Sequence, residues 1–288
     1  MRLAVIKRIF SGLSVGAVWA LGLLFAPPVV LFAAMLGCAL LCQWEFYRLA
    51  ERGGYTACRW LGLGMGALWL TSIFVAGHRN YQMESLLLVV GGGGLLTRLL
   101  FDARMARPME AAAITLLGFG YVPFLMGFFI YVAHGGADGA MTFSRGGIFL
   151  AFYAALVVKM TDVGAYAVGT ACGRHKMFPR ISPAKSWEGL AGGLALGVGC
   201  SVAIVLLARH WSVIPATPLS HVSLLVAVGV GLLLGVMGVL GDLIESMFKR
   251  SVHAKDSSGI LPAMGGLLDV FDSLLFAPAV LYFLLPFL

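Results

Sequence analysis

Charged residues are scarce in this chain. Only 11% of its 288 residues are Asp, Glu, Lys or Arg, whereas soluble globular domains carry about 25%. Hydrophobic residues make up 60% of the chain, and the mean hydropathy is +0.94. This composition excludes a separate soluble domain, a disordered chain, a collagen and a coiled coil. It is typical of a protein that lies mostly within a membrane.

Cysteine is also rare. The five cysteines show no CxxC or CxxH spacing, which argues against a disulfide framework and against a zinc site. Because they lie mostly in apolar runs, we expect buried thiols. They are Cys38, Cys42, Cys58, Cys172 and Cys200.

Long apolar runs are abundant. A bilayer core about 30 Å thick needs about 20 apolar residues per helix, and lipid leaves no backbone polar group unpaired. We predict an all-α polytopic membrane protein with about nine transmembrane helices. The predicted spans are 9–26, 29–47, 60–77, 83–101, 111–133, 147–170, 189–208, 219–241 and 263–287. The first is expected to be retained, because no small-residue cleavage site precedes Pro27.

The basic residues predict the direction of these spans. With a cytoplasmic N-terminus, sixteen of the twenty Lys and Arg residues fall inside, Lys159 lies within a span, and only Arg79, Arg145 and Arg209 fall outside. Cytoplasmic loops carry such an excess, so the C-terminus is predicted to lie outside. The formal net charge of +7 therefore indicates topology rather than nucleic-acid binding. We divide the chain into residues 1–146, with about five spans, and residues 147–288, with about four.

Small residues are dense in the spans, and Gly91–Gly94 is the extreme case. Missing side chains let helix backbones approach, so we interpret this cluster as a packing surface. A functional break in the helix is the alternative, although no polar group neighbours the cluster.

The thirteen acidic residues form two groups. Six lie at span ends or in loops and need no special role: Glu45, Glu51, Glu84, Asp102, Glu110 and Asp138. The others lie in or near the predicted cytoplasmic ends of the last four spans: Asp162, Glu188, Asp242, Glu245, Asp256, Asp269 and Asp272. An ionisable group within a span is costly and normally faces a cavity or a partner. Several at one membrane level predict a shared site.

Helical spacing supports this prediction. A polar stripe at i, i+3, i+4 and i+7 is formed by Asp242, Glu245, Ser246 and Lys249. Asp269 and Asp272 are expected to share a face near the start of the last span. Carboxylates without clustered His or Cys suit a hard divalent cation such as Mg²⁺. Because adjacent Lys and Arg suit phosphate, the pattern predicts a nucleotide-phosphate site at a membrane surface.

A second polar region joins spans six and seven. Lys159 and Asp162 are three residues apart and are expected to neutralise each other. Ser182 is followed by a proline, a pattern typical of a helix N-cap with proline at the first helical position. A helix starting there would direct free N–H groups at an anion, with Arg180 and Lys185 beside it. The alternative is a basic cytoplasmic loop with a capped helix.

Three spaced motifs lie between Asp162 and Asp272. They are Asp162-Val-Gly-Ala-Tyr166, Ser182-Pro-Ala-Lys185-Ser-Trp-Glu188-Gly189, and the segment 241–272, which contains Gly241-Asp242-Leu-Ile-Glu245, Ser246-Met-Phe-Lys249-Arg250 and Lys255-Asp256-Ser-Ser-Gly-Ile-Leu-Pro262-Ala-Met264-Gly265-Gly266-Leu-Leu-Asp269-Val270-Phe-Asp272. The last segment closely resembles the signature of the phosphatidate cytidylyltransferases, or CDP-diacylglycerol synthases. The other two are similar to further family elements, in the expected order. The resemblance covers about 110 residues and is far more specific than a lone short motif.

The resemblance implies that residues 147–288 are a catalytic region. It would transfer a cytidylyl group from CTP to phosphatidate, giving CDP-diacylglycerol and pyrophosphate. The protein would screen two polyanions from each other and stabilise the leaving group. We assign Asp242 and Asp269 as the principal ligands of Mg²⁺, with a second cation as an option, and Asp256 and Asp272 as further ligands.

The remaining assignments concern phosphate oxygens. Lys249, Arg250 and Lys255 are predicted to hold the lipid phosphate or the departing pyrophosphate. Arg180, Ser182 and Lys185 are predicted to hold the other phosphate oxygens. The substrate-binding set is completed by Asp162, Tyr166, Glu188, Glu245, Ser246, Gly265 and Gly266. The implied partners are CTP, phosphatidate and membrane lipid, at the cytoplasmic side of an inner membrane, and a homodimer is left open.

Two residues depart from the family pattern. The family usually has His where Met264 stands and Arg where Val270 stands. Met cannot donate a hydrogen bond to phosphate, and Val removes a cation. A catalytically altered paralogue and a non-catalytic membrane scaffold therefore remain alternatives. So do a CTP-dependent lipid kinase and a transporter, the latter needing midplane charges and internal repeats.

Overall fold

The computed structural model describes residues 26–76, 81–102, 106–135, 141–210, 218–260 and 265–288. Within these ranges, eight helices are long and apolar enough to cross a membrane. Each overlaps one predicted span, which confirms an all-α polytopic membrane protein. All but the last residue of the remaining predicted span, 9–26, lies outside the described residues.

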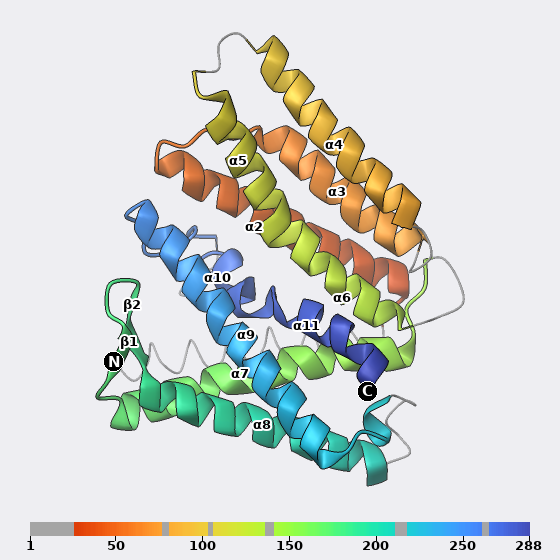
Figure 1. Ribbon diagram of the computed structural model, residues 1–288, viewed down its shortest axis with the longest axis vertical. Coiled ribbons are helices and arrows are strands. Elements are labelled where there is room, and N and C mark those ends of the chain that lie inside the picture. Colours follow the sequence, from red (N-terminus) through yellow and green to blue (C-terminus); the bar gives the residue numbers. More distant parts are fainter. Residues whose placement is uncertain (1–25, 77–80, 103–105, 136–140, 211–217, 261–264) are drawn as a thin grey trace. The chain divides into compact units, whose positions relative to one another are not determined.

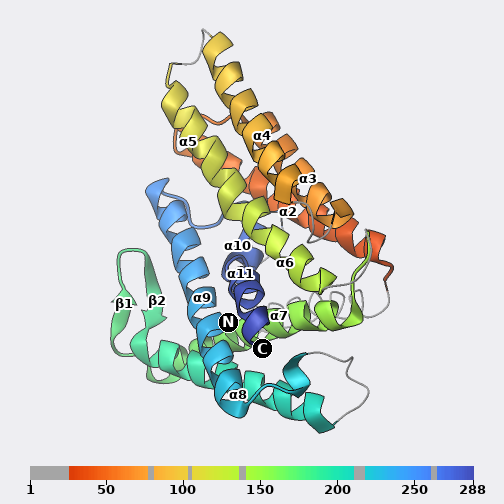
Figure 2. The same cartoon turned by 45° about the vertical axis from the view of Figure 1, so that its right-hand side comes forward.

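The chain forms two compact units (Figures 1 and 2). Unit 1 comprises Met1–Ile130, Asp138–Thr142 and Asp256–Val270. Unit 2 comprises Tyr131–Ala137, Phe143–Lys255 and Phe271–Leu288. Residues 256–270 of the signature segment, called the signature loop below, cluster with the N-terminal spans, so the two units do not follow a single boundary in the sequence.

Among the described residues, four spans contribute to unit 1. They are α2 (Pro28–Arg52), α3 (Arg59–Ala76), α4 (Tyr81–Phe101), and a span made of α5 (Pro108–Phe119), a π-helical turn (Gly120–Phe124) and α6 (Leu125–His134), whose last residues pass into unit 2. Pro123 lies inside the π turn, where a residue without an N–H interrupts the regular hydrogen-bond ladder. The short helix α10 (Leu268–Phe271) belongs to the signature loop and ends at the boundary between the units.

The Tyr47 side chain on α2 lies between α2, α3 and α5 of unit 1. Its side chain is fully buried, and its hydroxyl donates a 2.8 Å hydrogen bond to the Thr115 carbonyl oxygen. Gln43 Nε2 donates to the Tyr47 hydroxyl at 3.1 Å and to the Gly62 carbonyl oxygen at 2.9 Å. A Cβ at Gly62 or Gly118 would collide with the Tyr47 ring. These two glycines therefore let α3 and α5 approach α2 closely.

Unit 2 contains three long helices, a hairpin and a broken C-terminal span. The elements are α7 (Arg145–Cys172), β1 (Lys176–Phe178), β2 (Ser182–Ser186), α8 (Trp187–His210), a 3₁₀ turn (Pro218–Ser220), α9 (Leu224–Ser251), a 3₁₀ turn η4 (Asp272–Leu274), α11 (Ala277–Leu284) and a last 3₁₀ turn (Leu285–Phe287). Ser144 caps α7 by accepting a 2.8 Å hydrogen bond from the Gly147 N–H.

Glycines bring α7 and α8 together along their length (Figure 1). A Cβ at Gly193 would lie 2.7 Å from the Thr161 carbonyl oxygen, and one at Gly164 would lie 2.8 Å from the Gly192 carbonyl oxygen. No side chain fits at such distances, so the two backbones pack directly against each other. The close glycine contacts between helices that the sequence suggested at Gly91–Gly94 are thus found here.

Among the described residues, the predicted packing surface at Gly91–Gly94 is found only at Gly91. A Cβ at Gly91 would contact Met65, but in the part of the chain that the structure describes, one at Gly92, Gly93 or Gly94 would meet nothing within 4 Å. Helix α4 continues unbroken through the cluster, so the structure also provides no support for a helix break there.

Two further expectations need correction. Ser182 does not start a helix, because Ser182–Ser186 forms β2 and pairs antiparallel with β1. The cap lies at Ser186, whose Oγ accepts a 3.1 Å hydrogen bond from the Gly189 N–H at the start of α8. Among the cysteines, Cys42 and Cys58 are buried as expected, whereas Cys172 is exposed at the end of α7.

Candidate functional site

A compact group of carboxylates lies in unit 2. Asp242 and Glu245 come from α9, and Asp272 comes from η4. One carboxylate oxygen from each lies within 4.8 Å of those of the other two. Glu245 is 0% exposed and Asp272 is 6% exposed, whereas Asp242 is half-buried. A cluster of buried acids at this density requires compensating positive charge or a bound cation.

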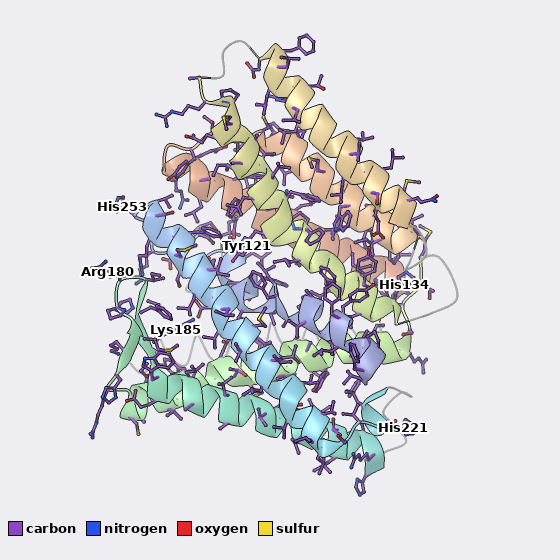
Figure 3. All side chains as sticks on the ribbon, viewed as in Figure 1. Tyr121, His134, Arg180, Lys185, His221 and His253 are labelled. Atoms are coloured by element: carbon purple, nitrogen blue, oxygen red, sulfur yellow. The ribbon has the colours of Figure 1, made fainter. Side chains whose placement is uncertain are left out.

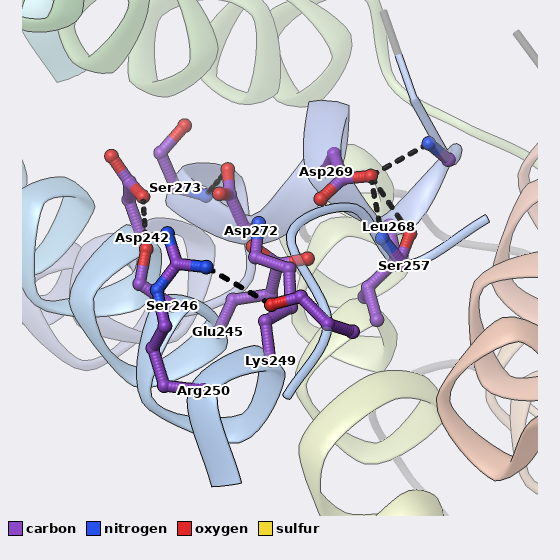
Figure 4. A network of polar contacts seen from close by, with 12 residues as sticks. Asp242, Glu245, Ser246, Lys249, Arg250, Ser257, Leu268, Asp269, Asp272 and Ser273 are labelled. Carbon is purple, nitrogen blue, oxygen red and sulfur yellow. Dashed lines mark hydrogen bonds and ion pairs between the residues drawn. The ribbon is translucent and has the colours of Figure 1, made fainter. Parts of the chain in front are cut away.

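Lysines supply part of that positive charge. Lys185, from β2, forms an ion pair with Asp242 at 2.9 Å, and Lys249 pairs with Glu245 one turn away on α9. Ser246 Oγ donates to Asp242 Oδ1 at 3.3 Å. The polar stripe predicted from helical spacing is thus confirmed, and Figure 4 shows its members on α9 beside Asp272.

A third lysine lies in the same unit. Lys159 pairs with Asp162 at 3.5 Å on α7, as predicted. Its ammonium group also donates to Ser273 Oγ at 2.9 Å, and Ser273 Oγ donates to Asp162 at 3.0 Å. The Ser273 N–H donates to Asp272 Oδ1 at 2.5 Å. Ser273 therefore connects the pair on α7 to the carboxylate group.

The carboxylate group fits a divalent cation by the chemistry of its donors. Carboxylate oxygens are hard ligands that Mg²⁺ prefers. Two oxygens on opposite sides of a Mg²⁺ ion are about 4.2 Å apart, because each Mg–O bond is about 2.1 Å. The three carboxylate oxygens lie within 4.8 Å of one another, so small side-chain movements would bring them to this distance. The fitting set contains Asp242 and Asp272, which were predicted as ligands, and Glu245, which was predicted to bind substrate.

The basic hairpin between α7 and α8 carries other predicted phosphate-binding residues besides Lys185. Arg180 is exposed in the turn between β1 and β2, and Lys185 lies on β2 (Figure 3). Arg250 links the end of α9 to this turn, since its Nε–H donates to the Ile181 carbonyl oxygen at 3.2 Å. Ser182 is half-buried at the start of β2, and Lys255 is exposed after α9.

Glu188 and Tyr166 are two more residues that were predicted to bind substrate. Glu188 closes the hairpin: it accepts hydrogen bonds from the N–H groups of Arg174 and His175, each at 3.2 Å, and contacts His175 Nδ1 at 2.5 Å. Tyr166 is 67% exposed on α7. Substrate binding by these two residues stays a prediction.

The signature loop of unit 1 holds the other predicted ligands. Asp269 Oδ2 accepts hydrogen bonds from the Ser257 N–H at 3.0 Å, the Ser257 hydroxyl at 2.9 Å and the Gly266 N–H at 2.6 Å (Figure 4). Gly265 has a φ of +91°, and a Cβ there would lie 2.6 Å from Asp269 Oδ2. Glycine is therefore required at this position. Asp256 is exposed, and metal binding by Asp256 and Asp269 stays a prediction.

Helix α10 ends before Asp272. The last predicted span begins with the four-residue α10 and continues as the 3₁₀ turn η4, so Asp269 and Asp272 do not lie on one regular α-helix. Asp272 joins Asp242 and Glu245, while Asp269 accepts hydrogen bonds within its own loop. Of the two departures from the family pattern, Val270 is half-buried in α10, and Met264 lies outside the described residues.

Three polar residues have contacts that the sequence does not predict. Spacing predicts only that Lys159 and Asp162 neutralise each other, and no motif or spacing in the sequence points to Ser273. Glu45 was expected to need no special role, yet it is fully buried and hydrogen-bonded to the signature loop. A carboxylate three residues inside its predicted span, 29–47, was the one signal in the sequence that pointed to it.

The fold and site define an integral membrane protein with a carboxylate and lysine site formed by its C-terminal spans. The family model of the cytidylyltransferase family matches residues 6–288, so the chain belongs to this family.

Individual relatives match over a shorter stretch. A phosphatidate cytidylyltransferase of Bacillus subtilis (strain 168) is 44% identical over 139 residues, 48% of this chain and 48% of that protein. One of Staphylococcus aureus (strain COL) is 42% identical over 139 residues, 48% of this chain and 50% of that protein. An uncharacterized protein of Escherichia coli (strain K12), YnbB, is 39% identical over 141 residues, 49% of this chain and 44% of that protein. The chain thus spans about half the length of the curated relatives it matches.

Proposed function

We propose that this protein transfers the cytidylyl group of CTP to phosphatidate, giving CDP-diacylglycerol and pyrophosphate. The observation that carries the proposal is the group formed by Asp242, Glu245 and Asp272, with the ammonium groups of Lys185 and Lys249 paired to two of its members. Family membership and the names of the relatives support the same reaction.

The reaction joins two polyanions. A phosphate oxygen of phosphatidate attacks the α-phosphorus of CTP and forms the new P–O bond, and the bond between the α- and β-phosphates breaks. The nucleophile is already anionic, so the residues chiefly position the substrates and compensate charge. Lys185 and Lys249 provide mobile ammonium groups for phosphate oxygens. Arg180 and Arg250 add cations at the hairpin.

We further propose that Asp242, Glu245 and Asp272 hold Mg²⁺. When bound, Mg²⁺ neutralises phosphate charge and stabilises the pyrophosphate leaving group. Lys159, Asp162 and Ser273 keep the Asp272 segment in place through the hydrogen bonds described above. The assignment of Asp269 as a metal ligand is a separate proposal, which rests on the family resemblance.

The location of the site follows from its substrates. CTP is a cytoplasmic nucleotide, and the phosphate of phosphatidate lies at the membrane surface. We therefore place the site at the cytoplasmic face of an inner membrane, in accordance with the excess of Lys and Arg in the segments predicted to lie inside.

The test is a product assay on the full chain purified in detergent. Protein is incubated with phosphatidate, Mg²⁺ and α-³²P-labelled CTP, and the lipid is extracted. We expect label in the lipid phase that disappears with a chelator and in Asp242→Asn and Asp269→Asn, while Asp102→Asn keeps it. Activity retained in Asp269→Asn would overturn the role of that residue as a ligand.

A parallel reaction with γ-³²P-labelled CTP separates a lipid kinase from a cytidylyltransferase. A kinase would label the lipid only from the γ-phosphate and would release CDP. Folded protein that binds CTP but labels lipid from neither position would be a degenerate member of the family, and the proposal would fail.

A further inference from the structure

Glu45 is a fully buried carboxylate in the second half of α2. Its Oε1 accepts hydrogen bonds from the Ser258 hydroxyl at 2.5 Å and the Leu267 N–H at 3.0 Å. Its Oε2 accepts from the Leu268 N–H at 2.7 Å and the Ser257 hydroxyl at 3.3 Å. A carboxylate has about four lone-pair sites, so the four groups within hydrogen-bond distance of Glu45 match its accepting capacity.

The four donors come from both ends of the signature loop. Ser257 and Ser258 precede its glycine-rich centre, and Leu267 and Leu268 follow it. The donors lie 212 to 223 residues from Glu45 in the sequence, so only the folded chain brings them together. The Glu45 side chain on α2 thus links the two ends of the loop through hydrogen bonds.

The same loop determines how Asp269 is oriented. The Ser257 hydroxyl has one proton, and both Glu45 and Asp269 lie within hydrogen-bond distance of it. Arg52, about two turns after Glu45 on α2, donates to the Ser257 carbonyl oxygen at 3.2 Å. A change at Glu45 therefore reaches Asp269 through Ser257 and through the adjacent Leu268 N–H.

We infer that Glu45 is a positioning residue for cytidylyl transfer, which holds both ends of the signature loop so that Asp269 keeps its orientation. This inference rests on the proposed function. The carboxylate acts through hydrogen-bond geometry and touches no substrate.

The variant Glu45→Gln tests the inference at constant size. An amide offers one acceptor oxygen and turns an NH₂ group toward groups that are themselves donors, so contacts on one side of the loop are lost. Glu51→Gln is the matched control, because Glu51 lies on the same helix and pairs with Arg59 on an exposed surface.

Kinetics separate positioning from a purely structural role. Per folded molecule, we expect kcat for cytidylyl transfer to fall about 100-fold in Glu45→Gln, as for a displaced catalytic group. The KM for CTP should change by less than about 3-fold. Glu51→Gln should match the unchanged protein in both. An unchanged kcat in folded Glu45→Gln would overturn the inference.

Hydrogen exchange provides a readout that does not need activity. In ligand-free protein, the Leu267 and Leu268 amides should lose protection in Glu45→Gln and keep it in Glu51→Gln. If the unchanged protein transfers no cytidylyl group, the proposed function fails, yet this comparison still decides whether Glu45 holds the loop. Unaltered protection would overturn the positioning role even if kcat fell.

A milder variant covers the case in which Glu45→Gln does not fold. Ser258→Ala removes one of the four donors and leaves Glu45 intact. We expect a smaller loss of kcat and partial loss of protection at Leu267. Unchanged kcat and unchanged protection in this variant would contradict the inference.

Discussion

Two carboxylates in each unit are stabilised by different kinds of partner. In unit 1, Glu45 and Asp269 accept hydrogen bonds from backbone N–H groups and serine hydroxyls. In unit 2, Asp242 and Glu245 pair with lysine ammonium groups. A backbone donor cannot leave its acceptor without rearranging the loop, whereas a lysine side chain can rotate to another anion. Unit 1 is therefore suited to holding a loop, and unit 2 is suited to exchanging partners with phosphate.

The units also use glycine differently. In unit 2, glycines lie where the α7 and α8 backbones touch, and no Cβ can be accommodated. In unit 1, no described residue lies within 4 Å of a Cβ built at Gly92, Gly93 or Gly94. A dense glycine cluster is thus a poor indicator of packing unless the neighbouring helix is known.

The largest expected effect is the loss of cytidylyl transfer when a carboxylate of unit 2 is replaced. Asp272→Asn should lower cytidylyl transfer on the order of 1,000-fold, because it removes one negative charge from the proposed cation site. The amide oxygen can still accept from the Ser273 N–H, so the fold should persist. The α-³²P assay with Asp102→Asn as the control measures this. Full activity in Asp272→Asn would show that the carboxylates of unit 2 are not suited to the reaction in the way proposed above.

The next largest effect is on the free energy of unfolding, to which the buried Lys249–Glu245 ion pair contributes. Lys249→Met leaves the Glu245 carboxylate, which is 0% exposed, without that ammonium group. We expect the free energy of unfolding to fall by about 3 kcal/mol. Adding Glu245→Gln should recover most of the loss, as measured by unfolding in detergent.

Lys185→Met is the matched comparison. The side chain of its partner Asp242 is 34% exposed, so water can replace the lost ammonium group. We expect a loss of about 1 kcal/mol or less, together with a higher KM for CTP. Equal destabilisation by the two lysine variants would show that burial of the pair is not what matters.

A loss of stability smaller than that of Lys249→Met tests the glycine comparison. Gly193→Ala forces a methyl group to within 2.7 Å of the Thr161 carbonyl oxygen, and we expect a loss of about 2 kcal/mol. Gly93→Ala on α4 meets nothing within 4 Å and should be neutral or stabilising by about 0.5 kcal/mol. Thermal melts of both variants check this. Similar melting temperatures would refute direct backbone packing of α7 on α8.

The smallest effect concerns the start of α8. Ser186→Ala removes the acceptor of the Gly189 N–H and should cost about 1 kcal/mol. Ser182→Ala should change stability by less than about 0.5 kcal/mol, because Ser182 caps no helix. A larger loss from Ser182→Ala would restore the cap that the sequence suggested.

Local spacing predicted local contacts well. The Lys159–Asp162 pair, the Lys249–Glu245 pair and the Ser246–Asp242 hydrogen bond join residues three or four apart on one helix. Such contacts follow from helix geometry alone, once a segment is known to be helical. The helical spans themselves followed from apolar length, because a membrane leaves few alternatives.

Contacts between distant segments could not be obtained in this way. The sequence did not show that Ser182–Ser186 would pair with β1, or that α10 would end before Asp272. Both depend on competing partners in space, which residue spacing does not describe.

The sequence by itself therefore determined the membrane-spanning helices, the polar face of α9 and the family motifs, since each depends on neighbours along one chain segment. Only the tertiary structure decided that Asp272 joins Asp242 and Glu245, and that Glu45 closes the signature loop. A buried carboxylate is stable only where several donors converge on it, and those donors come from segments that packing alone brings together.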